Sequence, residues 1–205
     1  MYYAPWIGRN YKRTRILLMS ESAYSWRNDG QLLHPPPNHP TNSVKWAIED
    51  FGDVKSSAYI KRVTQAICHK SEPSRAERTS AWDEYAYWIY IPGSVGEGAG
   101  GRRTEKMWKA GKRDFERLVE GLEPEPEKVI ITSLSAWKNM KESDVHLTDT
   151  LQAYRLKSSG SLMWCLAVPH PASRKRGKGF RWSEIAEQIA LFRSTVFPKK
   201  WKPNS

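Results

Sequence analysis

The sequence has few cysteines and no long apolar run. Its 205 residues include only Cys68 and Cys165, which stand far apart and form no C-x-x-C pair. This chain alone therefore cannot build a four-cysteine zinc or iron–sulfur site, and we expect both thiols to be small buried side chains. No stretch approaches the roughly 20 apolar residues that cross a bilayer, and the first residues lack the apolar centre of a signal peptide. We expect a cytoplasmic protein with no membrane partner.

Motifs for metal and nucleotide chemistry are also lacking. The chain has no H-x-x-x-H pair, and Glu123, Glu125 and Glu127 alternate with prolines in an expected linker. These absences argue against a metal-dependent nuclease, and we expect no metal and no cofactor. The glycine-rich segment Ser94–Arg103 ends in two arginines and could cradle a phosphate, but no G-K-[ST] follows it. That absence argues against a P-loop.

Basic and aromatic residues are abundant. Lysine and arginine number 33 against 22 aspartates and glutamates, so the formal net charge is +11. Such a surplus suits a polyanionic partner, because neutralised phosphates release counterions. The ten tryptophans and nine tyrosines supply core volume and flat rings for base stacking. We expect one domain over residues 1–205 with a basic C-terminal tail, acting as a monomer on double-stranded DNA.

Apolar runs alternate with amphipathic segments along the chain. The expected strands are Arg15–Met19, Tyr87–Ile91, Lys128–Thr132 and Ser161–Val168. The expected helices are Thr41–Phe51, Ser57–His69, one opened by a capping box at Ser80, Thr104–Leu122, Ser133–Lys141 and Trp182–Val196. The proline-rich residues 27–42 are expected to form a loop. This order favours an α/β fold, a three-layer α/β/α domain with a central, mostly parallel four-stranded sheet.

Polar residues follow each expected strand. In a parallel sheet the carboxyl ends of the strands meet at one edge, where active sites lie. Glu21 and His170 are the candidate catalytic residues there, because one carboxylate and one imidazole without metal ligands suit charge-stabilised bond cleavage. The candidate pocket residues are Ser20, Ser22, Tyr24, Tyr87, Trp88, Ile89, Tyr90, Thr132 and Ser133. The candidate DNA-binding residues are Ser173, Arg174, Lys175, Arg176, Lys178, Arg102 and Arg103.

Four segments, in order and each at a strand end, resemble the uracil-DNA glycosylase superfamily. "PWIGRNYKRTRILLMSESAY" is similar to the first strand and its water-activating loop, written GQDPY or GExPG in relatives. "YAYWIYIPG" resembles the middle strand, and "KVIITSLSAW" the strand and turn that relatives write V-I-x-x-G-x-x-A. "HPASRKRGKGF" resembles the H-P-S-x-x-x-x-x-x-G-F loop.

The resemblance implies a monofunctional glycosylase that flips a nucleotide out of the duplex and hydrolyses its glycosidic bond through an oxocarbenium-like state. Glu21 would take the place of the family's Asp, orienting water and stabilising the positive sugar. His170 would donate a hydrogen bond to the departing base. Tyr24 or Tyr87 would stack on that base, and Ser173 would bind a phosphate. Arg174–Lys178 would contact the DNA.

The sequence departs from the family pattern where the base is read. "YAYWIYIPG" contains no Asn or Gln, and Ile89 stands where many relatives carry the Asn that reads uracil. Isoleucine supplies neither hydrogen-bond donor nor acceptor. A different reader and a larger pocket, lined by residues 27–42 and 94–103, fit a bulky modified base. Antiphage members of the superfamily remove glucosylated hydroxymethylcytosine from phage DNA, and the resemblance extends to that role.

Two alternatives remain open at this point. One is a repair glycosylase for uracil or another damaged base. The other is a non-catalytic DNA-binding module on the same scaffold, which the altered loop at Met19–Ala23 keeps in play.

Overall fold

The four expected strands form the parallel centre of one sheet. The structure, a computed structural model, describes residues 3–51, 58–97, 103–140, 142–171, 174–175, 178–179 and 182–200. The parallel strands lie in the order β5 (Tyr85–Ile89), β2 (Ile16–Ser20), β7 (Lys128–Ile131) and β10 (Leu162–Ala167). Leu17, Ala86, Val129 and Cys165 are fully buried in this centre, as expected for apolar runs covered on both faces.

The sheet has seven strands, so the expectation of four was wrong. β1 (Trp6–Ile7) pairs antiparallel with β5, while β9 (Leu151–Arg155) and β8 (Val145–Thr148) extend the sheet antiparallel beyond β10. β1 has only two residues, and three of the four residues of β8 are exposed. Short or half-solvated edge strands carry no continuous apolar run, which explains why the sequence pattern did not reveal them.

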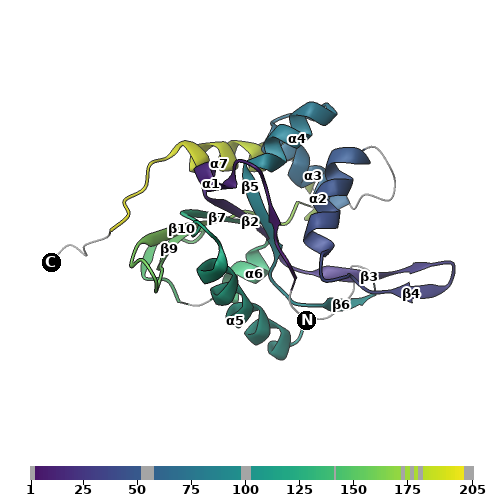
Figure 1. Cartoon of the computed structure of the whole chain (residues 1–205), viewed down its shortest axis with the longest axis horizontal. Helices are drawn as coiled ribbons and strands as arrows, with labels where there is room; N and C mark the ends of the chain where they lie inside the picture. Colours follow the sequence, from purple (N-terminus) through teal and green to yellow (C-terminus); the bar gives the residue numbers. More distant parts are fainter. Residues whose placement is uncertain are drawn as a thin grey trace.

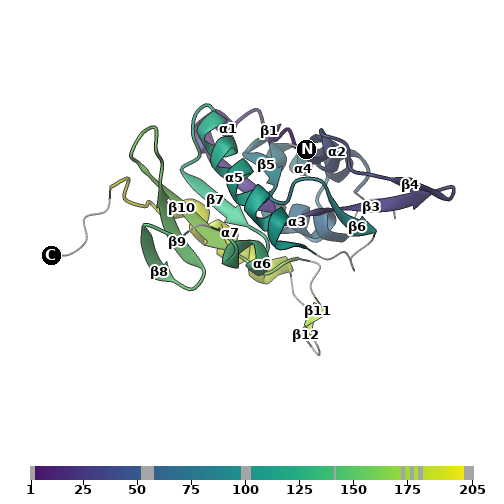
Figure 2. The same cartoon turned by 90° about the horizontal axis from the view of Figure 1, so that it is seen from below.

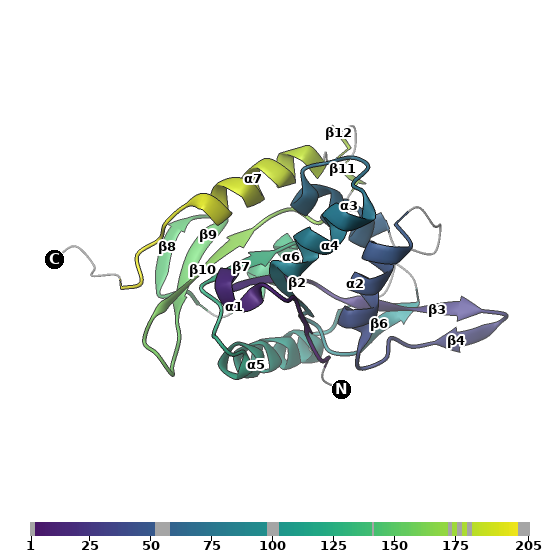
Figure 3. The ribbon, with the colours of Figure 1, turned by 45° about the horizontal axis from the view of Figure 1, so that its top comes forward.

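Helices cover both faces of the sheet. The helices are α1 (Tyr11–Thr14), α2 (His39–Glu49), α3 (Ala58–Cys68), α4 (Arg75–Asp83), α5 (Glu105–Gly121), α6 (Leu134–Lys138) and α7 (Trp182–Ser194). α5 lies on one face, and α3, α4 and α7 lie on the other (Figure 3). Phe115 of α5 contacts the ring of Trp88 on β5, whereas Trp82 of α4 contacts Tyr87 of the same strand. Successive side chains of a strand point to opposite faces, so β5 joins both layers.

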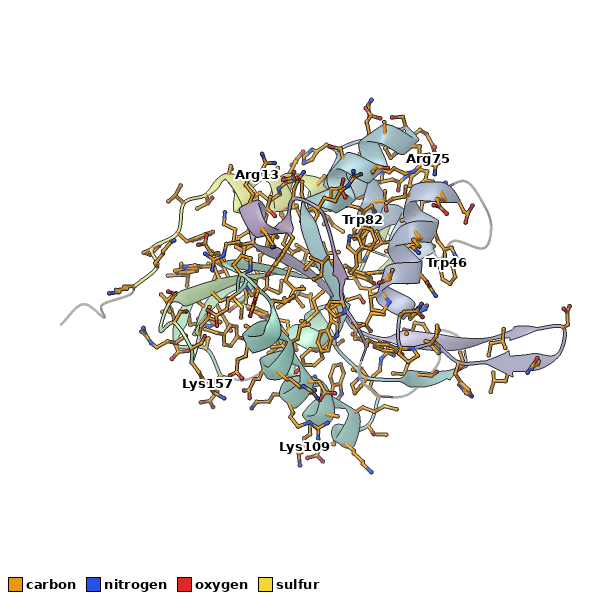
Figure 4. All side chains as sticks on the ribbon, viewed as in Figure 1. Arg13, Trp46, Arg75, Trp82, Lys109 and Lys157 are labelled. Atoms are coloured by element: carbon orange, nitrogen blue, oxygen red, sulfur yellow. The ribbon has the colours of Figure 1, made fainter. Side chains whose placement is uncertain are left out.

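The interior and the surface differ sharply in residue type. Trp82 is fully buried and hydrogen-bonds through its indole N–H to Thr64 Oγ1, 3.1 Å away. Arg13, Lys109 and Lys157 project from the outside of the molecule (Figure 4). No helix among the described residues combines the length and the apolar character that crossing a bilayer requires.

A β-arm, made of β3 (Ala23–Asn28), β4 (Gln31–Leu33) and β6 (Ser94–Glu97), extends from the body (Figure 1). β3 pairs antiparallel with β4 and parallel with β6. Asp29 and Gly30 turn between β3 and β4 with φ of 49° and 79°, the left-handed values that an Asp-Gly hairpin turn adopts. The arm corrects part of the expectation that residues 27–42 and 94–103 form loops, because 27–28, 31–33 and 94–97 lie in its strands, whereas 34–38 form neither strand nor helix.

Helix boundaries also differ from the sequence prediction. α4 begins at Arg75, with Ser74 and Glu77 forming the capping box, so Ser80 is an interior position. α2 begins two residues earlier than expected, and α6 has five residues and ends at Lys138. α2 ends at Glu49, two residues before the expected end at Phe51.

Candidate active site

The candidate site lies where the strand order reverses. Across the sheet the parallel strands lie in the order β5, β2, β7 and β10, so β2 and β7 are neighbours. The next parallel strand after β2 is β5, on one side of this pair, and the next after β7 is β10, on the other side. Open α/β sheets bind ligands at this switch point, beyond the carboxyl ends of the strands. Glu21 follows β2, and Thr132 and Ser133 follow β7. His170 follows β10, which is the next strand beyond β7.

Glu21 is a buried carboxylate with both oxygens bound. The residue is 6 % exposed, and its backbone carbonyl accepts a 2.8 Å hydrogen bond from the N–H of Ile91. Ser133 donates its hydroxyl to Oε2, and Arg103 approaches Oε1 at 2.6 Å. The same Ser133 oxygen accepts from the N–H groups of Ser135 and Ala136, so it also caps α6. These bonds hold the carboxylate in one orientation.

Arg103 lies inside the candidate site. Its Nη2 donates to the Tyr24 hydroxyl at 2.6 Å and to Ser22 Oγ at 3.4 Å, and its guanidinium lies 5.6 Å from the centre of the Tyr24 ring. The Arg103 side chain is 25 % exposed. The sequence predicted Arg103 as a DNA-binding residue, and the structure brings it together with Glu21, Ser22 and Tyr24.

His170 is held from α3. Its ring lies 4.9 Å from the Tyr59 ring at an interplanar angle of 33°. Arg62, three residues after Tyr59 and therefore on the same helix face, donates to the carbonyl of Pro171 at 2.8 Å. Burial lowers the pKa of His170; the charge of Glu21 opposes this shift, and Arg103 and Arg62 reinforce it. His170 is therefore neutral at pH 7 and within electrostatic reach of Glu21.

Hydroxyl groups form a buried network at the strand ends below His170. The Tyr59 hydroxyl lies 2.5 Å from Thr132 Oγ1, and Tyr87 donates to Ser20 Oγ at 3.0 Å. Burial raises the pKa of Tyr59 well above its usual range and that of Tyr87 to about 12, so both phenols are protonated. Tyr59 lies in the expected helix Ser57–His69 and was not among the candidate site residues.

The structure does not bring two candidate pocket residues, Trp88 and Tyr90, to Glu21. Both are fully buried and point to the α5 face, where Trp88 donates to the carbonyl of Tyr3 and Tyr90 to that of Asn139. Strand alternation places Ile89 on the opposite face with Tyr87. Ile89 is 2 % exposed and pairs with Ser20 in the sheet. The remaining pocket candidates, Ser20, Ser22, Tyr24, Tyr87, Thr132 and Ser133, lie around Glu21 and the hydroxyl network.

A basic hairpin follows the candidate site. β11 (Arg174–Lys175) and β12 (Lys178–Gly179) pair antiparallel and project from the body beyond α6 and α7 (Figure 2). The antiparallel pairing places the backbones of the candidate DNA-binding residues Arg174, Lys175 and Lys178 on this hairpin. Arg102, Ser173 and Arg176 lie outside the described residues.

Other polar groups lie away from this site. Two surface hollows, one beside Arg9 and Arg75 and one beside His69 and Arg193, lie near the start of β5, at the opposite edge of the sheet. Within the described part of the chain, no three His, Cys, Asp or Glu side chains gather as metal ligands would. Cys165 is buried in β10, and burial raises the pKa of Cys68 to about 11, so neither thiol has nucleophilic character.

Comparison with known proteins gives no family assignment. No protein-family model matches the sequence, and a search of curated proteins finds no significant match.

Proposed function

We propose that this protein is a DNA glycosylase that hydrolyses the N-glycosidic bond of a flipped base. The observation that carries the proposal is that Glu21 and His170 both lie beyond parallel strands, β2 and β10, at the carboxyl edge of one sheet, where the Glu21 charge opposes the lowering of the His170 pKa. An acid residue and a neutral imidazole at one strand edge match the two ends of a breaking glycosidic bond. One end becomes a cationic sugar and the other an anionic base.

Each residue then has a defined task. The Glu21 carboxylate stabilises the positive sugar and orients water, whose oxygen bonds to C1′ as the bond to the base breaks. The bonding electron pair leaves with the base, and neutral His170 donates a hydrogen bond to it as negative charge grows there. The proton lost by the attacking water passes to Glu21 and then to solvent. Tyr24, beside Glu21, supplies a ring face for the base.

The substrate of this proposed reaction is a modified cytosine in DNA, with glucosylated hydroxymethylcytosine of phage DNA as the leading case and antiphage defence as the role. Two features support this choice. The net charge of +11 and the basic hairpin suit a phosphodiester chain. Ile89 is buried in the core, so the position that reads uracil in many relatives offers no polar group to a base. A uracil repair glycosylase has less support for that reason.

One observation favours a non-catalytic DNA-binding module as the second candidate. Both oxygens of Glu21 are already bound, by Arg103 and Ser133. A glycosylase needs at least one of these oxygens to face water or the sugar, so Arg103 must move when substrate enters. A binding module needs no such movement.

The decisive experiment measures base release and DNA binding separately. Duplexes carrying uracil, hydroxymethylcytosine or its glucosylated form are incubated with the protein, and released bases are identified by mass spectrometry. Glu21→Gln and His170→Ala are expected to lower base release at least 100-fold and to change DNA affinity less than threefold. Lys109→Gln, an exposed change on α5, is the matched control.

Each outcome separates the candidates. Release of modified cytosine that depends on Glu21 and His170 supports the proposal, whereas release of uracil alone assigns the protein to repair. Tight DNA binding without release of any base from the unaltered protein supports the module instead.

A further inference from the structure

Arg103 places hydrogen-bond donors among the candidate site residues Glu21, Ser22 and Tyr24. A guanidinium carries five N–H donors in a planar fork and no acceptor. Three of its contacts, to Glu21, Ser22 and Tyr24, belong to the loop and strand that follow β2. The side chain is three-quarters buried, whereas an arginine that contacts only DNA phosphates would stand at the rim.

The donor pattern selects among bases. Unprotonated cytosine presents two adjacent acceptors, N3 and O2, on its pairing edge, and a guanidinium can bind both. Uracil presents an N3–H donor at the same place, which would face another donor. Substituents at C5, including a hydroxymethyl group or its glucoside, leave the N3 and O2 edge unchanged.

Resting on the proposed function, we infer that Arg103 is the residue that reads the base and selects cytosine and its C5-modified forms over uracil. The Glu21 carboxylate occupies the guanidinium until a base edge with two acceptors replaces it. This exchange has a second effect. Once Arg103 pairs with the base, the charge of Glu21 is no longer neutralised and acts on the cationic sugar.

The exchange also serves the leaving group. As the C1′–N1 bond breaks, the electron pair moves onto the base and raises the negative charge at O2. A guanidinium bound there stabilises the departing anion, and solvent water supplies the proton afterwards. Arg103 and His170 would then share the leaving base, while Glu21 and Ser133 remain with the sugar.

The test compares substitutions that alter the donor pattern by degrees. Arg103→Lys keeps the charge and loses the planar fork, and Arg103→Gln offers one donor and one acceptor, the pattern that suits uracil. Lys106→Gln is the control, because it removes an exposed positive charge three residues away. Thermal unfolding of each variant checks that it is folded. If Arg103→Gln is unfolded, the comparison of Arg103→Lys with wild type tests the inference.

Two measurements are made on duplexes that differ only at the target base. The first is the single-turnover rate of base release from glucosylated hydroxymethylcytosine, hydroxymethylcytosine and uracil. The second is affinity for the same duplexes carrying 2′-fluoroarabino nucleotides of cytosine or uracil, whose glycosidic bonds resist cleavage. We expect Arg103→Gln to shift the cytosine-to-uracil ratio at least tenfold toward uracil in both measurements. Arg103→Lys should lower the rate on modified cytosine at least tenfold, and Lys106→Gln should leave every ratio within twofold.

The outcomes separate this inference from the proposed function. If base release occurs but Arg103→Gln weakens all substrates by the same factor, Arg103 contacts a phosphate or only supports the fold, and the inference fails while the glycosylase proposal stands. If no base is released but affinity for the resistant analogues discriminates cytosine through Arg103, the inference stands without catalysis. Equal affinities for the two analogues, unchanged in Arg103→Gln, overturn it.

Discussion

At the residue scale, the ring of Tyr59 is expected to position His170 rather than to take part in the reaction. Tyr59→Phe keeps the ring 4.9 Å from His170 and removes the hydroxyl bond to Thr132, so base release should stay within threefold of wild type and stability should fall by about 1 kcal/mol. Tyr59→Ala removes the ring and should lower kcat at least tenfold.

The pH profile distinguishes positioning by Tyr59 from general destabilisation. Burial lowers the pKa of His170, so the neutral form persists below the usual histidine value, and the acid limb of kcat/KM, which reports the free protein, should have its midpoint below about pH 6.5. Tyr59→Ala lets water reach the imidazole and should move that midpoint upward. An acid limb identical in wild type and Tyr59→Ala would contradict a positioning role.

Residue roles were predictable only where neighbouring residues carry a local signal. Glu21 and His170 each follow a buried apolar run, so the sequence predicted their placement at strand ends. Tyr59 sits at helical spacing with Ile60 and Val63, a pattern that predicts burial but not the reach of a hydroxyl to a strand end. Arg103 forms an ion pair with Glu21, 82 positions earlier in the sequence, and no short sequence motif spans that separation.

At the element scale, Gly111 sets how closely α5 packs on the sheet. A Cβ at this position would lie 2.7 Å from the carbonyl oxygen of Tyr90 and 2.9 Å from its ring. Gly111→Ala should therefore lower the free energy of unfolding by about 1–3 kcal/mol, even though alanine has the higher helix propensity. Ala110→Gly on the same helix is the control for propensity alone. Chemical denaturation gives both values, and a more stable Gly111→Ala would contradict the close approach.

The same scale shows why elements were predicted unevenly. The four parallel strands are apolar along most of their length, and α5 carries an apolar stripe from Met107 to Val119. These patterns located all five elements in the sequence. The strands of the β-arm were not predicted, because they lie beside proline- and glycine-rich segments in which turn residues dominate the sequence pattern. The shift of α4 followed from choosing Ser80 and Asp83 over Ser74 and Glu77, two spacings that both satisfy the capping-box rule.

At the scale of the whole molecule, stability should fall as the pH is lowered below neutrality. Burial lowers the pKa of His39 to about 4, so between about pH 6.5 and 4 the unfolded chain binds a proton that the folded chain does not. The free energy of unfolding therefore rises with pH across this window, by up to about 3 kcal/mol for His39, and the lowered pKa of His170 adds in the same direction. His39→Phe keeps a ring against Tyr3 and Trp46 and should flatten the profile. Urea unfolding at several pH values tests this, and parallel profiles would contradict it.

Five residues of the candidate site lie at the strand edge, and they come from segments spread over 150 positions of the sequence. They are Glu21, Tyr59, Arg103, Ser133 and His170. Only a fragment that runs from residue 21 or earlier to residue 170 or later holds the complete set. Under the proposed function, a chain that ends before His170 lacks the imidazole and should release no base.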